Sequence, residues 1–285
     1  AFGRSRATFG LGPSHVLGPT PWVPLQRTAM LAPAVRRSML QSLEKKAYFV
    51  CDLDISKANL DALRIDVESL QHEPGFFNAA GQAQHRGDRI GWIGKRGAEE
   101  RRLPRLASAL KFMLVDLPSF LPQTPAITGP AEAMLSLYDG GAAYAPHRDG
   151  VADASFSGVA RSAARALLSG GVGAALSTLA TATSPVAHRE LTTILYLNPS
   201  DWDLTRDGGA LRLFGGAEAG DRCGETATGV LDVSPLGGRL VVFESRRVLH
   251  AVLPATRRRL ACTAWHLDAA ATLGAATAAN VRNEW

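Results

Sequence analysis

Three residues of this chain have the types and the spacing of metal ligands. His147 and Asp149 are separated by one residue, and residues two apart point to the same face of an extended segment. His250 follows much later, in the strand-like stretch 247–252. Two imidazoles and one carboxylate form the facial ligand set of non-haem Fe(II) sites, which leaves coordination positions open. A His-x-Asp motif alone is common by chance, but the three residues together predict a metal centre that can bind a bidentate 2-oxo acid and dioxygen.

An arginine nine residues after His250 gives this predicted site a second function. Arg259 carries a permanent charge on a forked guanidinium, which suits the distal carboxylate of a dicarboxylic co-substrate. By strand alternation, Thr263 and Trp265 share its face. The alternative is a surface arginine in the basic run 257–259. The preceding His-x-Asp motif and the distal histidine make that alternative the weaker one.

The surrounding sequence predicts the elements that must position these residues. Two amphipathic helices are expected at about 56–71 and 103–117, with strands at 47–53 and 89–93 beside them. Short apolar stretches broken by Gly and Pro then predict strands at 133–138, 190–197, 210–214, 228–233, 238–243, 247–252 and 259–267. This order is typical of an α+β fold with a double-stranded β-helix, or jelly-roll, core and supporting N-terminal helices.

The N-terminal stretch predicts a separate extension. Residues 1–43 contain five arginines and no acidic residue, a composition shared with organelle transit peptides. The alternative is a disordered, weakly basic N-terminus. Residues 44–285 are predicted to form one domain, with the jelly-roll core at about 133–268. Within this core, residues 151–187 are rich in Ala, Ser and Gly and are expected to be an insertion between two strands.

Composition limits the classes of function. No apolar run approaches the roughly 20 residues that a membrane-spanning helix needs. The net charge of +5 is accounted for by residues 1–43, so the chain from Glu44 onward is balanced and no nucleic-acid partner is expected. Cys51, Cys223 and Cys262 lack the spacing of a zinc site or a disulfide framework. This favours a reducing intracellular compartment, cytoplasm or nucleus, with organelle targeting by the N-terminal stretch as the alternative.

Several sequence blocks around the predicted ligands resemble a known family. They run in family order across about residues 45–268, and they include the His-x-Asp motif, the distal histidine and the arginine after it. The chain resembles the 2-oxoglutarate- and Fe(II)-dependent oxygenases. More specifically, it is similar to the prolyl 4-hydroxylase branch, in the form of the hypoxia-sensing prolyl hydroxylases and their algal and bacterial relatives. The matching blocks are 86–92, 137–149, 191–203, 208–214, 238–243 and 250–265.

The resemblance implies a role for each matching residue. His147, Asp149 and His250 would bind iron and so be the catalytic centre. Arg259 would pair with the distal carboxylate of 2-oxoglutarate, and Tyr196 would donate its hydroxyl to the same carboxylate.

The resemblance also implies roles around this centre. Tyr138 and Tyr144 would line the site near the metal, the latter on the substrate side, and Thr263 and Trp265 would wall the co-substrate pocket. The family pattern further predicts that Asp88 approaches Arg189 and orders a loop over the peptide-binding face.

The implied activity is that of an oxidoreductase, a dioxygenase using Fe(II), 2-oxoglutarate and dioxygen, with ascorbate (vitamin C) as reductant. Its implied substrate is a proline in a peptide or protein, hydroxylated at C4 as 2-oxoglutarate is converted to succinate. An oxygenase acting on another peptide side chain or on a small molecule is one alternative, and a catalytically inactive jelly-roll binding module is another. The sequence departs from the family pattern at 151–187 and in the charged loop after Trp92, which leaves the substrate open.

Overall fold

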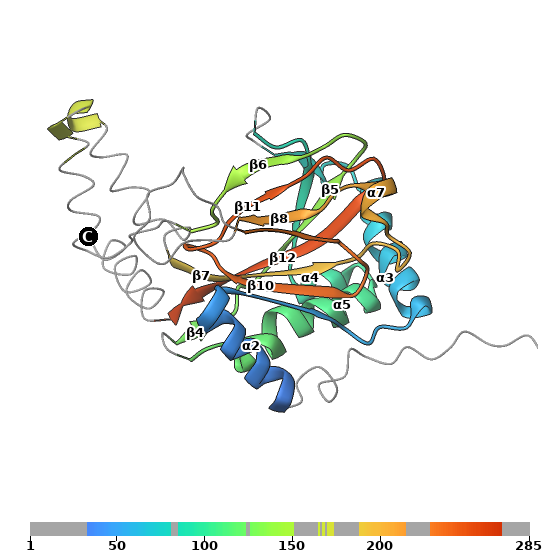
Figure 1. The fold of residues 1–285 in the computed structure, drawn as a ribbon. Helices are drawn as coiled ribbons and strands as arrows, with labels where there is room; N and C mark the ends of the chain where they lie inside the picture. Colours follow the sequence, from blue (N-terminus) through green and yellow to red (C-terminus); the bar gives the residue numbers. More distant parts are fainter. Residues whose placement is uncertain are drawn as a thin grey trace, which may run out of the picture.

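The computed structural model describes residues 33–80, 85–123, 126–150, 188–214 and 229–269, together with part of 165–173. Two antiparallel sheets face each other and form its centre (Figure 1). The larger sheet has eight strands in the order β1-β10-β7-β12-β5-β3-β2, with β4 beside β12. The smaller sheet has the order β6-β11-β8-β9. This is the predicted jelly-roll arrangement.

The strands are short, as the spacing of Gly and Pro predicts. The larger sheet consists of β1 (Tyr48–Asp52), β2 (Asn78–Ala79), β3 (Arg89–Ile93), β4 (Ile127–Thr128), β5 (Ala133–Tyr138), β7 (Arg189–Tyr196), β10 (Arg239–Glu244) and β12 (Arg259–Asp268). The smaller sheet consists of β6 (Tyr144–His147), β8 (Leu211–Phe214), β9 (Val230–Val233) and β11 (Leu249–Val252).

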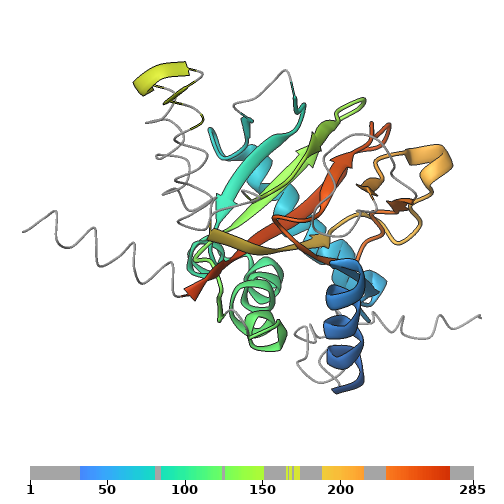
Figure 2. The ribbon, with the colours of Figure 1, turned by 60° about the vertical axis from the view of Figure 1, so that its left-hand side comes forward.

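Helices cover the face of the larger sheet that points away from the smaller one (Figure 2). They are α2 (Pro33–Lys46), α3 (Lys57–Ser69), α4 (Lys95–Glu100) and α5 (Pro104–Lys111). Short 3-10 turns follow at Leu70–His72 and Leu117–Phe120, and a π-helical turn at Phe112–Asp116 extends α5. A single helical turn, α7 (Leu204–Asp207), precedes β8. None of the described helices is long and apolar enough to span a membrane.

Alternation along β12 separates two cores. Leu260, Cys262 and Ala264 point to the helices and join the larger apolar cluster. Ala261 points to the other side, into the smaller cluster between the two sheets. Arg259 is buried on this same inner side, so β12 carries a charged residue into the space between the sheets.

Side chains cap the helices that support the sheet. Ser56 accepts a hydrogen bond from the Asn59 amide at the start of α3, as the sequence predicts. Helix α5 has no capping side chain of its own. Its amides of Arg105 and Leu106 instead donate to Asp66 of α3, at 2.8 and 3.0 Å. This carboxylate therefore both caps α5 and ties it to α3.

The structure corrects one detail of the predicted organisation. The domain was expected to begin at residue 44, but α2 begins at Pro33 and buries Met39 and Leu43, so the last residues of the expected extension are part of the fold. Residues four apart on a helix share a face, which is why this pair packs together. The rest of residues 1–43, and nearly all of the expected insertion 151–187, lie outside the described residues.

Candidate active site

The three predicted metal ligands meet between the two sheets. His147 ends β6 and His250 lies opposite it on β11, while Asp149 follows in the turn after β6. The His147 Nε2 atom is 3.6 Å from Asp149 Oδ1, and the His250 Nε2 atom is 3.7 Å from Asp149 Oδ2. One possible ligand atom from each residue lies within 4.8 Å of the other two. This geometry can hold one metal ion.

Backbone carbonyls determine which imidazole nitrogen of each histidine is free. The Nδ1 atom of His147 is 2.8 Å from the Ala145 carbonyl oxygen, and that of His250 is 3.2 Å from the Val248 carbonyl oxygen. Because a carbonyl oxygen only accepts, each Nδ1 donates its proton there, which leaves Nε2 as the nitrogen that can bind a metal. Such second contacts orient histidines for a metal. The ligand set therefore fits a divalent iron.

Two hydroxyls support the carboxylate of the site. Thr192 donates its hydroxyl to Asp149 Oδ2 at 2.8 Å, and the Ser245 hydroxyl lies 2.8 Å from that of Thr192. Burial alone would raise the pKa of Asp149, but the two neighbouring imidazoles and the Thr192 hydroxyl outweigh burial and hold it well below its usual range. The carboxylate is therefore ionised at neutral pH, as a metal ligand must be.

Arg259 is a buried cation in the same space. Its Nε atom donates to the Gly209 carbonyl at 2.9 Å, and an Nη atom lies 3.4 Å from the Tyr196 hydroxyl. Its guanidinium carbon is 4.9 Å from the centre of the Tyr138 ring. No carboxylate among the described residues pairs with it. Because an isolated buried charge is costly, this guanidinium fits an anion that enters from outside.

A cavity of about 160 Å³ connects the metal ligands with Arg259. Among the predicted site residues, its walls include His147, Asp149, His250, Arg259, Tyr138, Tyr144, Thr263, Trp265 and Arg189. Tyr196 does not line this cavity but contacts Arg259, and Asp88 lies outside it. The cavity can therefore hold a small dicarboxylate with one end at the metal ligands and the other at the guanidinium.

Aromatic rings surround the cavity on the substrate side. The Tyr144 ring stacks on His147 with 3.6 Å between centroids, and the guanidinium of Arg86 lies 4.4 Å from the centre of the Tyr144 ring. Trp92 and Trp265 are 5.6 Å apart, and Trp92 is 46% exposed. These rings offer flat, apolar surfaces beside the metal ligands.

The predicted contact between Asp88 and Arg189 is wrong. Asp88 is buried and accepts two hydrogen bonds from Arg86, at 2.7 and 2.6 Å. Arg86 is two residues away, and its guanidinium donates one hydrogen bond to each carboxylate oxygen of Asp88. Arg189 instead lies over the Trp265 ring at 4.0 Å and donates to the Asp149 carbonyl at 3.3 Å. The acid thus fixes Arg86 above Tyr144.

Some site residues were not predicted from the sequence. Ser136 and Ile194 line the cavity, and Thr192 donates to Asp149. Strand alternation could have identified Thr192 and Ile194 from Tyr196, and Ser136 from Tyr138, because each shares the face of its neighbour two residues away. The Gly209 carbonyl had no such signal, since a backbone atom at a turn has no side-chain pattern.

The residues of this site fall within a sequence region of known type. Residues 133–267 match the sequence profile described as the 2OG-Fe(II) oxygenase superfamily. The match includes all three candidate metal ligands and Arg259. This part of the chain belongs to the 2OG-Fe(II) oxygenase superfamily. The membership that the sequence blocks predicted is therefore confirmed.

Relatives of this 2OG-Fe(II) oxygenase domain include named prolyl hydroxylases. The chain is 42% identical over 81 residues to a Caenorhabditis elegans hypoxia-inducible factor prolyl hydroxylase, covering 28% of this chain and 10% of that protein. It is 40% identical over 82 residues to mouse prolyl hydroxylase EGLN3, covering 28% and 30%. The chain thus spans less than a third of either relative.

The fold is similar to that of a solved prolyl hydroxylase structure. That protein is a prolyl hydroxylase from Trichoplax adhaerens, in complex with a peptide fragment of the hypoxia-inducible factor oxygen degradation domain. It aligns with a TM-score of 0.57 and 22% identity over 84% of this chain and 91% of that chain. At this level of identity the likeness shows a shared fold.

Proposed function

We propose that the protein is an Fe(II)- and 2-oxoglutarate-dependent dioxygenase that hydroxylates a peptidyl proline at C4. One observation carries this proposal: the cavity joins a two-histidine, one-carboxylate cluster to Arg259, a buried cation without a described carboxylate partner. 2-Oxoglutarate has a keto acid at one end and a carboxylate at the other, which matches both ends of the cavity.

His147, Asp149 and His250 would hold the iron. When bound, the iron supplies activation of dioxygen for hydroxylation, coupled to the decarboxylation of 2-oxoglutarate to succinate and carbon dioxide. In the balanced reaction, one oxygen atom enters the substrate C–H bond and the other enters succinate. Ascorbate would serve as the reductant that maintains Fe(II).

Arg259 and Tyr196 would bind the distal carboxylate of 2-oxoglutarate. Arg259 would donate charge-assisted hydrogen bonds to it. Burial raises the pKa of Tyr196, so the hydroxyl keeps its proton and can donate as well. Thr263 and Trp265 would exclude water from the co-substrate pocket, since both line the cavity.

The aromatic surround would receive the substrate. A proline ring is compact and apolar, and the exposed face of Trp92 with the ring of Tyr144 suits such a group. Asp88 would act indirectly, by holding Arg86 against Tyr144. The similarity to prolyl hydroxylases supports proline over other side chains.

The test is turnover by the purified chain with Fe(II), ascorbate and 2-oxoglutarate, with and without proline-containing peptides. We expect peptide-dependent succinate release and one added oxygen on proline, both lost in His147→Ala. His72→Ala, which changes an exposed histidine, is the matched control and should keep activity. Succinate release with hydroxylation of another residue or of a small molecule would replace the substrate assignment. Absence of any iron-dependent 2-oxoglutarate turnover would overturn the proposal.

A further inference from the structure

A glycine turn between α7 and β8 touches the candidate co-substrate arginine. Gly208 and Gly209 have φ angles of 63° and 70°, a region that favours glycine. A Cβ atom on Gly208 would lie 2.4 Å from the Pro254 carbonyl oxygen, and one on Gly209 would lie 3.1 Å from Cδ of Arg259. The turn therefore brings its backbone against the arginine side chain, where no larger residue fits without displacement.

This contact fixes one side of the guanidinium. The Gly209 carbonyl accepts the Nε–H of Arg259 at 2.9 Å, so that edge of the fork is already used. An Nη atom lies near the Tyr196 hydroxyl, and the remaining N–H groups are left for a ligand in the cavity. The position of a single carbonyl oxygen thus sets the direction in which Arg259 can donate.

Trp202 holds the glycine turn from the other side. The indole is buried, and its Nε1–H donates to the Gly208 carbonyl at 2.9 Å. An indole ring atom would lie 3.4 Å from a Cβ on Gly209, so the ring is also close to the second glycine. The indole therefore binds the peptide unit between the two glycines and lies close to Gly209, although it does not line the cavity itself.

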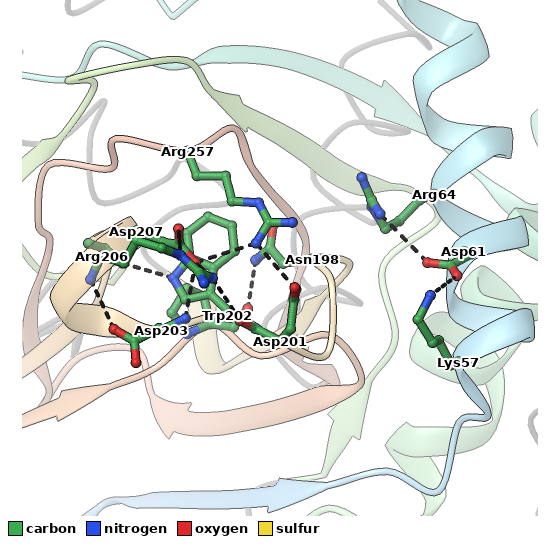
Figure 3. Close-up of polar contacts among 12 residues, drawn as sticks. Lys57, Asp61, Arg64, Asn198, Asp201, Trp202, Asp203, Arg206, Asp207 and Arg257 are labelled. Carbon is green, nitrogen blue, oxygen red and sulfur yellow. Dashed lines mark hydrogen bonds and ion pairs between the residues drawn. The ribbon is translucent and has the colours of Figure 1, made fainter.

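A buried carboxylate holds the helical turn that lies between Trp202 and the two glycines in the sequence (Figure 3). Asp207 accepts two hydrogen bonds from Arg206, at 2.8 and 2.6 Å, and one from the Asp203 amide at 3.0 Å. Arg257 reaches the same carboxylate at 3.4 Å. These bonds stabilise α7 directly before Gly208. They therefore restrain the backbone around Gly208, whose carbonyl accepts the hydrogen bond from Trp202.

We propose that Trp202 is a positioning residue for 2-oxoglutarate binding. With the glycine turn 208–209, it would orient Arg259 toward the distal carboxylate. This inference rests on the proposed function, because it assumes that Arg259 binds a dicarboxylate. An arginine side chain has many rotamers, and holding one of them in advance lowers the entropic cost of binding. Trp202 and the glycine turn would therefore increase the affinity for the distal carboxylate and would not affect the chemistry at the metal.

The test measures dissociation constants of anaerobic Fe(II)-loaded protein by calorimetry, for 2-oxoglutarate and for 2-oxobutanoate, which lacks the distal carboxylate. Trp202→Phe keeps a buried ring and removes the N–H donor. We expect its affinity for 2-oxoglutarate to fall roughly tenfold, as when one charge-assisted hydrogen bond is weakened. Affinity for 2-oxobutanoate and kcat at saturating 2-oxoglutarate should change less than about twofold.

Two further variants separate positioning from general stability. Asp207→Asn weakens the hydrogen bonds that stabilise α7 but keeps the indole. It should therefore lower the affinity for 2-oxoglutarate and not that for 2-oxobutanoate, even if Trp202→Phe does not fold. Asp66→Asn loosens α5 on the helix side of the larger sheet and should leave both affinities unchanged.

Each result has a distinct meaning. If the wild-type protein does not bind 2-oxoglutarate, the proposed function fails. If the wild-type protein binds it and the folded Trp202→Phe and Asp207→Asn variants bind it equally well, the positioning role is overturned. Equal losses for both 2-oxo acids would also overturn it, since they would indicate a general structural effect.

Discussion

His147 and His250 are register partners on neighbouring antiparallel strands, and their imidazole centroids are 4.2 Å apart. Strand pairing therefore sets the spacing of two candidate iron ligands that are far apart in the sequence. A slip of one residue between β6 and β11 would turn one imidazole to the other face of the sheet. The correct register is thus a condition for the metal site and not only for the fold.

Thr192 should influence metal affinity through Asp149. Thr192→Val keeps the shape of the side chain and removes the hydroxyl that donates to the carboxylate. We expect the affinity for Fe(II) to fall roughly tenfold, as for other contacts that orient a metal ligand. Thr193→Val is the matched control, because Thr193 points to the opposite face and contacts His266. Metal titration should separate the two variants, and equal affinities would argue against this role.

The guanidinium of Arg259 should be needed for 2-oxoglutarate and not for folding alone. In Arg259→Gln we expect the KM for 2-oxoglutarate to rise at least about tenfold, because a charge-assisted contact is lost. Arg258→Gln removes a neighbouring arginine that pairs with Asp139 at the surface. Steady-state kinetics should show a normal KM for that control. A rise in both variants would mean that local charge, not the buried fork, matters.

Removing the carboxylate between α3 and α5 should destabilise the helical layer. Asp66→Ala leaves two amides of α5 without an acceptor. We expect a loss of about 2 kcal/mol in the free energy of unfolding, measured with urea. Asp61→Asn, which alters an exposed pair with Lys57, should change it by less than about 0.5 kcal/mol. Equal effects would contradict the capping role.

Stability should fall on acidification partly because of His266. Burial lowers the pKa of this imidazole to about 3, whereas an unfolded histidine titrates near 6.5. As the pH falls, His266 is protonated first in the unfolded chain. Its contribution to the free energy of unfolding is therefore complete above about pH 6.5 and is lost progressively toward pH 3. Between about pH 6.5 and pH 5 this loss is about 2 kcal/mol.

A variant comparison isolates this contribution. His266→Gln can keep a hydrogen bond to Thr193 but does not titrate, so its unfolding free energy should depend less on pH over this range. His72→Gln changes an exposed histidine and should follow the wild-type curve. Parallel curves for the wild-type protein and His266→Gln would show that the buried imidazole is not responsible.

The sequence was sufficient for much of the fold and for the centre of the site. The bounds predicted at 89–93 and 133–138 agree with β3 and β5, because apolar stretches there end at clear Gly or polar breaks. The geometry of the two histidines and Asp149 also follows the prediction. By contrast, β6 was expected only as an extended segment, since four residues that include Pro146 show no alternation.

Contacts that depend on several elements could not be read from the sequence. Asp88 pairs with Arg86, whereas the other candidate cation, Arg189, lies over the ring of Trp265. The Gly209 carbonyl depends on a turn held by Trp202, and no residue pattern encodes its direction. Local pattern thus predicts which face a side chain occupies, but not which of two cations reaches an acid.

The alternation along β12 also bears on resistance to oxidative damage. Cys262 lies on the helix side of the larger sheet, away from the metal ligands, and burial raises its thiol pKa to about 12. Cys51 joins the same apolar cluster, and burial raises its pKa to about 11. Reactive oxygen attacks thiolates far more readily than thiols. The sheet thus keeps both described cysteines protonated and separates them from the candidate metal site, where the proposed reaction would activate dioxygen.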